Sequence, residues 1–150
     1  MLQARDLLTM SNVRYSAYNS WPGSNVYIST ANQLFGTFRD LKRAQSLDRN
    51  YLHWEAHHIV EKQDLIRLGI SHRFPTSEYQ LCILLPASAH RSRVSQILHS
   101  ANPTGTVVSR QILRQSYVAA YLIIGDYCGG GEAAIRSELL AIVDWVLAMP

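Results

Sequence analysis

The sequence has only two cysteines and no long uninterrupted apolar run, and each shortage excludes a class of protein. Cys82 and Cys128 belong to no C-x-x-C pair, which argues against a cysteine-based zinc site. Cys82 lies inside an apolar run, so we expect a buried free thiol, with a disulfide to Cys128 as the alternative. The first residues lack the layout of a signal peptide, and charged residues interrupt the longest apolar stretches short of a membrane span. We therefore expect a soluble protein.

The composition is that of a folded domain with a mildly basic charge. The 150 residues are 47% hydrophobic and 17% charged, which argues against disorder. This length fits one domain with a buried core. The net charge of +3 fits a polyanionic partner, but many ordinary proteins carry as much charge, so it selects no function by itself.

The first third of the chain predicts two helices around a turn and a short strand. We expect a helix over residues 2–9, a turn-rich segment at 19–25 and a strand at 26–29. Thr30 is then the expected N-cap of a helix that continues to about Ser46. Three cations lie off the apolar stripe of this helix: Arg39, Lys42 and Arg43. A solvated face is the simpler interpretation of these cations, and contact with phosphate groups is the alternative.

The middle of the chain predicts two strands followed by a helix. Residues 51–60 mix aromatic, apolar and histidine residues without helical periodicity, so we expect them to be extended. A polar connection with a helical turn at 63–68 leads to the apolar run 80–85, which predicts a buried strand. A helix over 89–99 follows, with Ser88 as its N-cap.

The last third predicts two core-forming helices, over residues 107–127 and 132–147, separated by three consecutive glycines. This triplet has the composition of a turn, because a phosphate-binding loop would need a preceding strand and a Lys-Ser/Thr pair that are absent here. We therefore expect a single α+β domain, mostly helical overall. It would consist of an N-terminal region (1–50), a central unit (51–100) and C-terminal helices (104–150).

The central unit carries three histidines whose spacing suggests a chemistry. His57 and His58 are adjacent on the first expected strand, and neighbouring side chains of a strand point to opposite faces. The two cannot be side-by-side ligands, so one imidazole would face a metal ion while the other faces an attacking water. Another ligand must come from far along the chain. His90, just after the second strand, is the natural candidate.

Three segments of the central unit resemble the Ala-His-His branch of the HNH/endonuclease VII superfamily: Trp54-Glu55-Ala56-His57-His58-Ile59-Val60, Cys82-Ile83-Leu84-Leu85-Pro86 and Ala89-His90-Arg91. The resemblance covers about residues 54–99 and implies a ββα-metal (HNH-like) motif embedded among helices. By position it makes His57 and His90 metal ligands and His58 the general base. It also implies a divalent metal ion, namely magnesium, manganese, zinc or nickel, and cleavage of DNA, less often RNA.

The family also implies a biological setting. Such domains are found as toxic C-terminal tips of bacterial polymorphic toxins, including Rhs-type effectors. The resemblance therefore implies a nuclease toxin domain within a larger secreted effector that is made in the bacterial cytoplasm. Delivery would take it into the cytoplasm of a target cell, and a cognate immunity protein would block it.

The sequence departs from the family pattern at two positions. Gln80 stands where many members have an asparagine, and Val94 stands where a second helical histidine is common. One metal ligand is therefore unassigned. Its candidates are Glu55, Glu61, His99 and solvent. Arg91 and Arg93, beside the expected site, are the candidates for phosphate binding.

A non-catalytic binding module is the alternative function. A His-His dipeptide by itself is more often structural than catalytic, and such a module would bind nucleic acid or protein with a structural metal or none. Closed structural zinc sites usually have four firm ligands including cysteines, whereas only two good ligands are visible here. Glu55 is equally ambiguous, because it would either orient an imidazole or lie exposed on its strand. A hydrolase of another phosphodiester is a third hypothesis.

Overall fold

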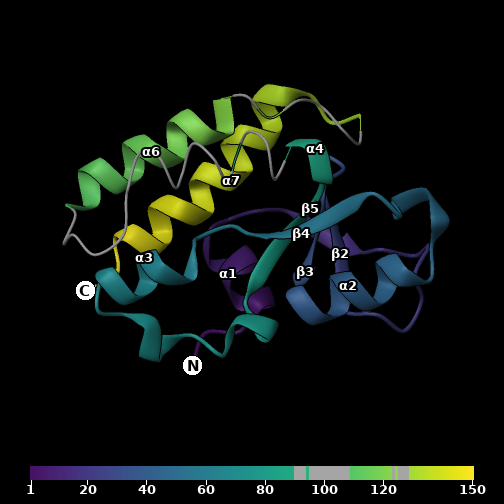
Figure 1. Ribbon diagram of the computed structural model, residues 1–150, viewed down its shortest axis with the longest axis horizontal. Helices are drawn as coiled ribbons and strands as arrows, with labels where there is room; N and C mark the ends of the chain where they lie inside the picture. The colour runs from purple at the N-terminus through teal and green to yellow at the C-terminus, as the bar shows by residue number, and fades with distance from the viewer. Residues whose placement is uncertain (90–93, 95–108, 123, 125–128) are drawn as a thin grey trace.

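The computed structural model describes residues 1–89, 94, 109–122, 124 and 129–150. In this part of the chain a five-stranded antiparallel sheet has helices packed on both faces (Figure 1), which confirms a mixed α+β fold. The order of the strands across the sheet is β1-β2-β3-β5-β4. The strands are β1 Tyr15–Ala17, β2 Val26–Ser29, β3 Leu34–Thr37, β4 Trp54–His58 and β5 Leu81–Pro86.

The helices divide between the two faces of the sheet. Helix α2 covers one face, and α1, α6 and α7 cover the other (Figure 1). The connection from β4 to β5 holds α3 and two short 3-10 helices, and β5 leads directly into α4. The helices are α1 Ala4–Met10, α2 Phe38–Ser46, α3 Lys62–Arg67, α4 Ala87–Ala89, α6 Arg110–Leu122 and α7 Glu132–Leu147. The 3-10 helices are η1 Arg49–Tyr51, η2 Ser71–Arg73 and η3 Ser77–Tyr79.

Strand β5 joins two hydrophobic cores because its side chains alternate between them. Ile83 and Leu85 belong to the core that contains residues of α1, α6 and α7. Cys82 and Leu84 belong to the smaller core under α2. A strand that is buried on both faces consists of consecutive apolar residues, which is why this segment was recognisable in the sequence. Cys82 is a buried free thiol as expected, and Cys128 lies outside the described residues.

The predicted helix over residues 30–46 is wrong in its first half. Residues 30–33 connect β2 to β3, with Asn32 in the left-handed region at φ 57°, and the helix begins only at Phe38. The true N-cap is Thr37, whose Oγ1 atom accepts a hydrogen bond of 3.0 Å from the backbone nitrogen of Asp40. Leu34 fits the spacing of a helical stripe, but pairing of β3 with β2 and β5 makes it part of a strand.

Most of the other predicted elements that fall within the described residues agree with the structure to within a few residues. Helix α7 and strand β2 have the expected bounds, and α6 lies inside the predicted 107–127 helix. Helix α4 begins at Ala87, so Ser88 lies inside it and is not the expected N-cap. Of the predicted helix over residues 89–99, only Ala89 and Val94 lie within the described residues. In the part of the chain that the structure describes, no helix is long and apolar enough to cross a membrane.

Candidate active site

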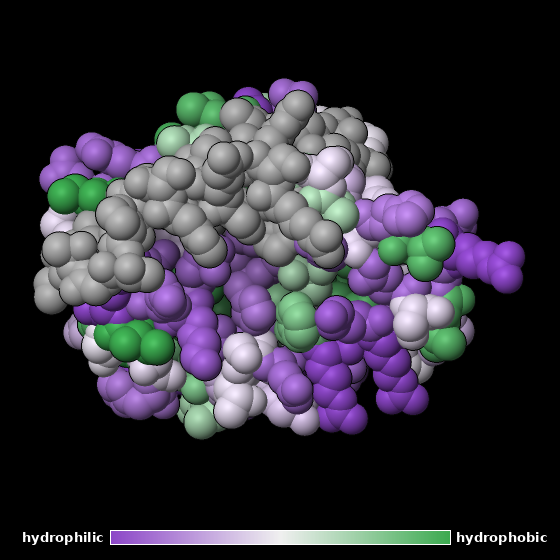
Figure 2. Space-filling view, viewed as in Figure 1, coloured by the Kyte–Doolittle hydropathy of each residue, from purple (hydrophilic) through white to green (hydrophobic). Residues whose placement is uncertain are grey.

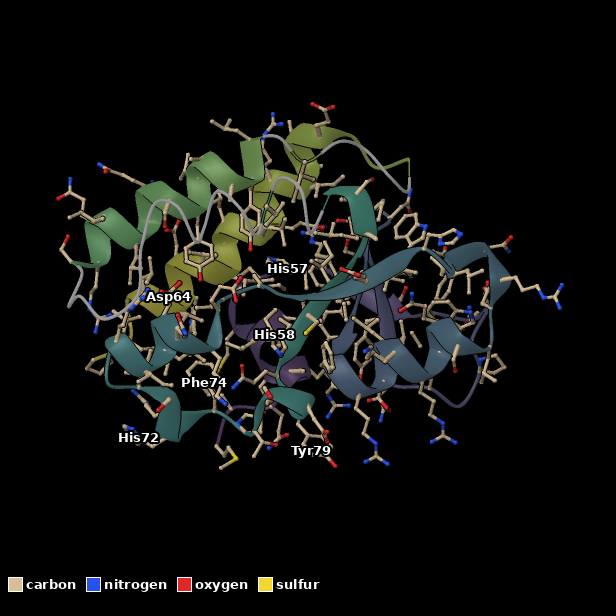
Figure 3. The ribbon with its side chains drawn as sticks, viewed as in Figure 1. His57, His58, Asp64, His72, Phe74 and Tyr79 are labelled. Carbon is tan, nitrogen blue, oxygen red and sulfur yellow. The ribbon has the colours of Figure 1, made fainter. Side chains whose placement is uncertain are left out.

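The side chains of His57 and His58 lie on opposite faces of the sheet at the end of β4 (Figure 3). His57 points toward α6 and is only 1% exposed. His58 points toward α2 and is partly exposed. This arrangement confirms what strand geometry predicts for adjacent residues, and it gives the two imidazoles different surroundings.

A tyrosine on α6 holds the ring of His57. The Nε2 atom of His57 lies 3.0 Å from the hydroxyl oxygen of Tyr121, and this hydroxyl donates a 2.7 Å hydrogen bond to the carbonyl oxygen of Ile59. A phenol has one proton, which here goes to the carbonyl, so His57 Nε2 must carry a hydrogen and donate it. In the neutral imidazole the lone pair therefore lies on Nδ1. Burial, followed by the charge of Glu61, raises the pKa of Tyr121 and keeps the phenol protonated.

A second tyrosine, one helical turn earlier, holds the segment that follows the histidine pair. The Tyr117 hydroxyl accepts a 2.8 Å hydrogen bond from the backbone nitrogen of Glu61 and donates one of 2.6 Å to Asp64. The other carboxylate oxygen of Asp64 accepts a 2.9 Å bond from Arg67. Burial, followed by the charge of Asp64, raises the pKa of Tyr117. Helix α6 therefore anchors residues 57–64 through two buried hydroxyl groups.

The ring of His58 is oriented by a backbone carbonyl and an aromatic ring. Its Nε2 atom lies 2.8 Å from the carbonyl oxygen of Ser77. A carbonyl can only accept, so Nε2 carries the hydrogen and the lone pair of the neutral ring lies on Nδ1. The ring also stacks on Phe38, with centroids 5.2 Å apart and planes inclined by 14°. An imidazole in one fixed tautomer and orientation is what general base catalysis requires.

The two carboxylates that the sequence offers near the histidines lie in different positions. Glu55 is two residues before His57 on β4, so both side chains are on the α6 face, and Glu55 pairs with Leu85. Glu61 precedes α3 as its N-cap. Burial, followed by the charge of Glu61, raises the pKa of both Cys82 and Tyr121. Both glutamates are partly buried.

Four of the residues singled out from the sequence lie outside the described part of the chain: His90, Arg91, Arg93 and His99. Ala89 is 4% exposed and Val94 is fully buried. Val94 belongs to the same hydrophobic core as Tyr121 and Ile83, on the face of the sheet toward which His57 points. Within the described residues, no three His, Cys, Asp or Glu side chains form a group that could hold a metal ion.

Several residues that build this site were not assigned a role from the sequence. Tyr117, Tyr121 and Asp64 received no role in the site from the sequence. Two tyrosines four residues apart on an apolar helix were a usable signal, because buried hydroxyl groups need partners. The Ser77 carbonyl carried no sequence signal, because any residue has a carbonyl oxygen.

No protein-family model matches the chain, and comparisons with curated proteins and with solved structures found no match. The function therefore has to be inferred from the geometry of the site itself. That geometry comprises two oriented imidazoles on opposite faces of one strand end, with buried Tyr121 fixing that of His57.

Proposed function

We propose that this chain is a metal-dependent endonuclease of the ββα-metal type, in which His58 is the general base. The observation that carries the proposal is the hydrogen bond that His58 Nε2 donates to the Ser77 carbonyl. This bond fixes the tautomer, so that Nδ1 is the basic atom of a partly exposed imidazole. The order and antiparallel pairing of β4 and β5, followed by α4, support the same assignment. In this proposal His58 Nδ1 takes a proton from the water that attacks the phosphodiester.

The described residues fit part of a metal site. His57, with its Nε2 hydrogen held by Tyr121, would offer Nδ1 to a divalent cation. The second ligand proposed is His90, which lies in the sequence between the buried residues Ala89 and Val94. A bound magnesium, manganese, zinc or nickel ion would stabilise negative charge on the phosphate and the leaving oxygen. The remaining protein ligand stays open among Glu55, Glu61 and His99.

The substrate and the biological setting are further parts of the proposal. DNA is favoured over RNA, and Arg91 and Arg93 remain candidate phosphate contacts. The chain would be the toxic domain of a larger secreted bacterial effector, delivered into the cytoplasm of a target cell. A cognate immunity protein would then be its inhibitor. These statements depend on the resemblance of residues 54–99 to the Ala-His-His nucleases.

A cleavage assay tests the central claim. Purified protein is incubated with supercoiled plasmid and, separately, with total RNA in magnesium, manganese, zinc or nickel, and in EDTA. We expect metal-dependent cleavage that His58→Ala lowers by about 10²–10⁴-fold. His72→Ala is the matched control, because His72 is an exposed histidine on η2. Full activity of His58→Ala would remove the proposed base.

A binding module is the second candidate function, and the burial of His57 favours it. A histidine that is 1% exposed and hydrogen-bonded to Tyr121 is also a reasonable core residue with a purely structural role. This alternative predicts no cleavage of DNA or RNA with any metal while the protein remains folded. A structural metal would in addition make EDTA lower the melting temperature, whereas a catalytic metal would leave it nearly unchanged.

A further inference from the structure

The first half of α2 lies against the ring of His58. Phe38, the first residue of α2, stacks on His58 with centroids 5.2 Å apart. One helical turn later, the Nζ atom of Lys42 lies 5.1 Å from the centroid of the Phe38 ring. The ammonium group of Lys42 and the imidazole of His58 therefore share one aromatic partner, the ring of Phe38.

A second cation of α2 is anchored to the segment that orients His58. The Cζ atom of Arg39 lies 5.8 Å from the centroid of the Tyr79 ring, and its guanidinium donates a 2.9 Å hydrogen bond to the Tyr79 hydroxyl. Tyr79 ends η3, and Ser77 at the start of η3 holds His58 Nε2 through its carbonyl.

These two cations are exposed, and they are not neutralised within the described residues. Arg39 and Lys42 are solvent-exposed, and neither forms an ion pair with a described carboxylate. The carboxylate of Asp40, between them in sequence, accepts a hydrogen bond from the Thr37 hydroxyl at the helix N-terminus. Glu78 on η3 is the nearby exposed anion. Figure 2 shows strongly hydrophilic side chains gathered over α2, at the lower right of the view.

We propose that Arg39 and Lys42 bind the phosphodiester backbone of double-stranded DNA next to the bond that is cleaved at His58. This inference rests on the proposed nuclease function and extends its substrate surface to α2, outside the central unit of residues 51–100. Each cation is held over an aromatic ring, so less side-chain freedom is lost when it meets a phosphate. Charged contacts of this kind position the duplex and supply affinity without reading sequence.

The salt dependence of DNA binding tests the proposal. A fluorescein-labelled DNA duplex is titrated with His58→Ala protein in EDTA, which should prevent cleavage, over a series of KCl concentrations, and anisotropy is recorded. The same background carrying Arg39→Gln and Lys42→Gln should bind roughly tenfold more weakly at low salt. The slope of log affinity against log salt should become shallower by about 1.8, the value for two lost phosphate contacts. Glutamine removes each positive charge and keeps a polar, uncharged side chain.

The matched control removes the same charge elsewhere. Arg5→Gln and Arg14→Gln neutralise two exposed cations on α1 and just before β1, and they should leave the slope unchanged. Equal losses of DNA affinity in the two double variants would overturn the proposal, because they would show that binding depends only on net charge. An unchanged slope in the α2 variant, or no binding by the His58→Ala parent, would also overturn it. Circular dichroism must show that both variants are folded.

The outcome is separable from that of the nuclease proposal. If the wild-type protein cleaves DNA but the α2 variant keeps the parental slope, the nuclease assignment stands and the α2 surface does not. If the wild-type protein cleaves nothing but the slope falls as expected, the surface is a DNA-binding site and the catalytic assignment fails.

Discussion

The imidazole of His57 and the hydroxyl of Tyr121 lie 3.0 Å apart although 64 residues separate them in the chain. Because the Tyr121 proton goes to the Ile59 carbonyl, this contact determines which ring nitrogen of His57 carries hydrogen. Helix α6 thus sets the chemical state of a residue on β4. If His57 binds a metal ion, Tyr121 also selects the nitrogen that does so.

Replacing Tyr121 with phenylalanine should change the tautomer of His57. The variant removes the hydroxyl that accepts from His57 Nε2 and donates to the Ile59 carbonyl. Two buried polar groups then lack this partner, so we expect the unfolding free energy to fall by about 1–3 kcal/mol. Nitrogen-15 NMR of the imidazole rings should show a wild-type His57 protonated at Nε2, and a mixture of tautomers in Tyr121→Phe. Tyr117→Phe is the control and should leave the His57 signals in place. An unchanged tautomer in Tyr121→Phe would contradict this role.

The hydrogen bond between Tyr117 and Asp64 should contribute strongly to stability, because it is buried and one partner is a carboxylate. Tyr117→Phe is expected to lower the unfolding free energy by about 1.5–3 kcal/mol. Urea denaturation of Tyr117→Phe, Asp64→Asn and the double variant gives the coupling energy. We expect the two losses to be non-additive by at least about 0.5 kcal/mol. Additive losses would show that the two side chains stabilise the fold independently.

The stacking of Phe38 on His58 predicts a moderate effect on catalysis. Phe38→Leu keeps an apolar side chain but removes the flat surface that aligns the imidazole, so we expect roughly a tenfold lower kcat, less than the loss in His58→Ala. The measurement is the rate of plasmid nicking at saturating substrate. Leu47→Ala serves as control, because Leu47 lies just past the C-terminal end of the same helix and is 83% exposed. Equal rates for Phe38→Leu and wild type would rule out this orienting role.

The half-buried Glu138 on α7 predicts a pH dependence of stability. Its carboxylate accepts a 2.6 Å hydrogen bond from Ser29, but burial outweighs the hydrogen bonds and raises its pKa above the usual value. The folded state therefore binds a proton more tightly than the unfolded state. The contribution of Glu138 to the free energy of unfolding is fully present below the ordinary glutamate pKa. It is lost as the pH rises through the raised pKa of the folded state.

Melting temperatures of wild type and Glu138→Gln across this pH range check the sign. The wild-type value should fall relative to that of the variant as the pH increases above the ordinary glutamate pKa, and the difference should then level off. A difference that grows in favour of wild type with increasing pH would mean that the hydrogen bonds outweigh burial.

Local sequence patterns were sufficient for several elements. The apolar run of β5, the helical periodicity of α7 and the strand at Val26–Ser29 were each recognisable without knowledge of their neighbours. Strand geometry alone also placed His57 and His58 on opposite faces. The helix predicted at Leu34 is wrong because the local pattern is misleading there. The spacing of Leu34 and Phe38 fits a helix, and only the pairing of β3 with β2 and β5 makes Leu34 part of a strand.

The candidate site shows the same division. Its histidine pair, its two strands and their order follow from residues close together in sequence, because side-chain alternation and apolar runs are local properties. The partners of the histidines do not follow from them. Tyr121, Phe38 and the Ser77 carbonyl reach the pair only when α6, α2 and η3 pack against the end of β4. The sequence by itself determined which imidazoles are present, and tertiary packing decided which nitrogen of each carries its proton, because a tautomer depends on the hydrogen-bond partner supplied from elsewhere in the chain.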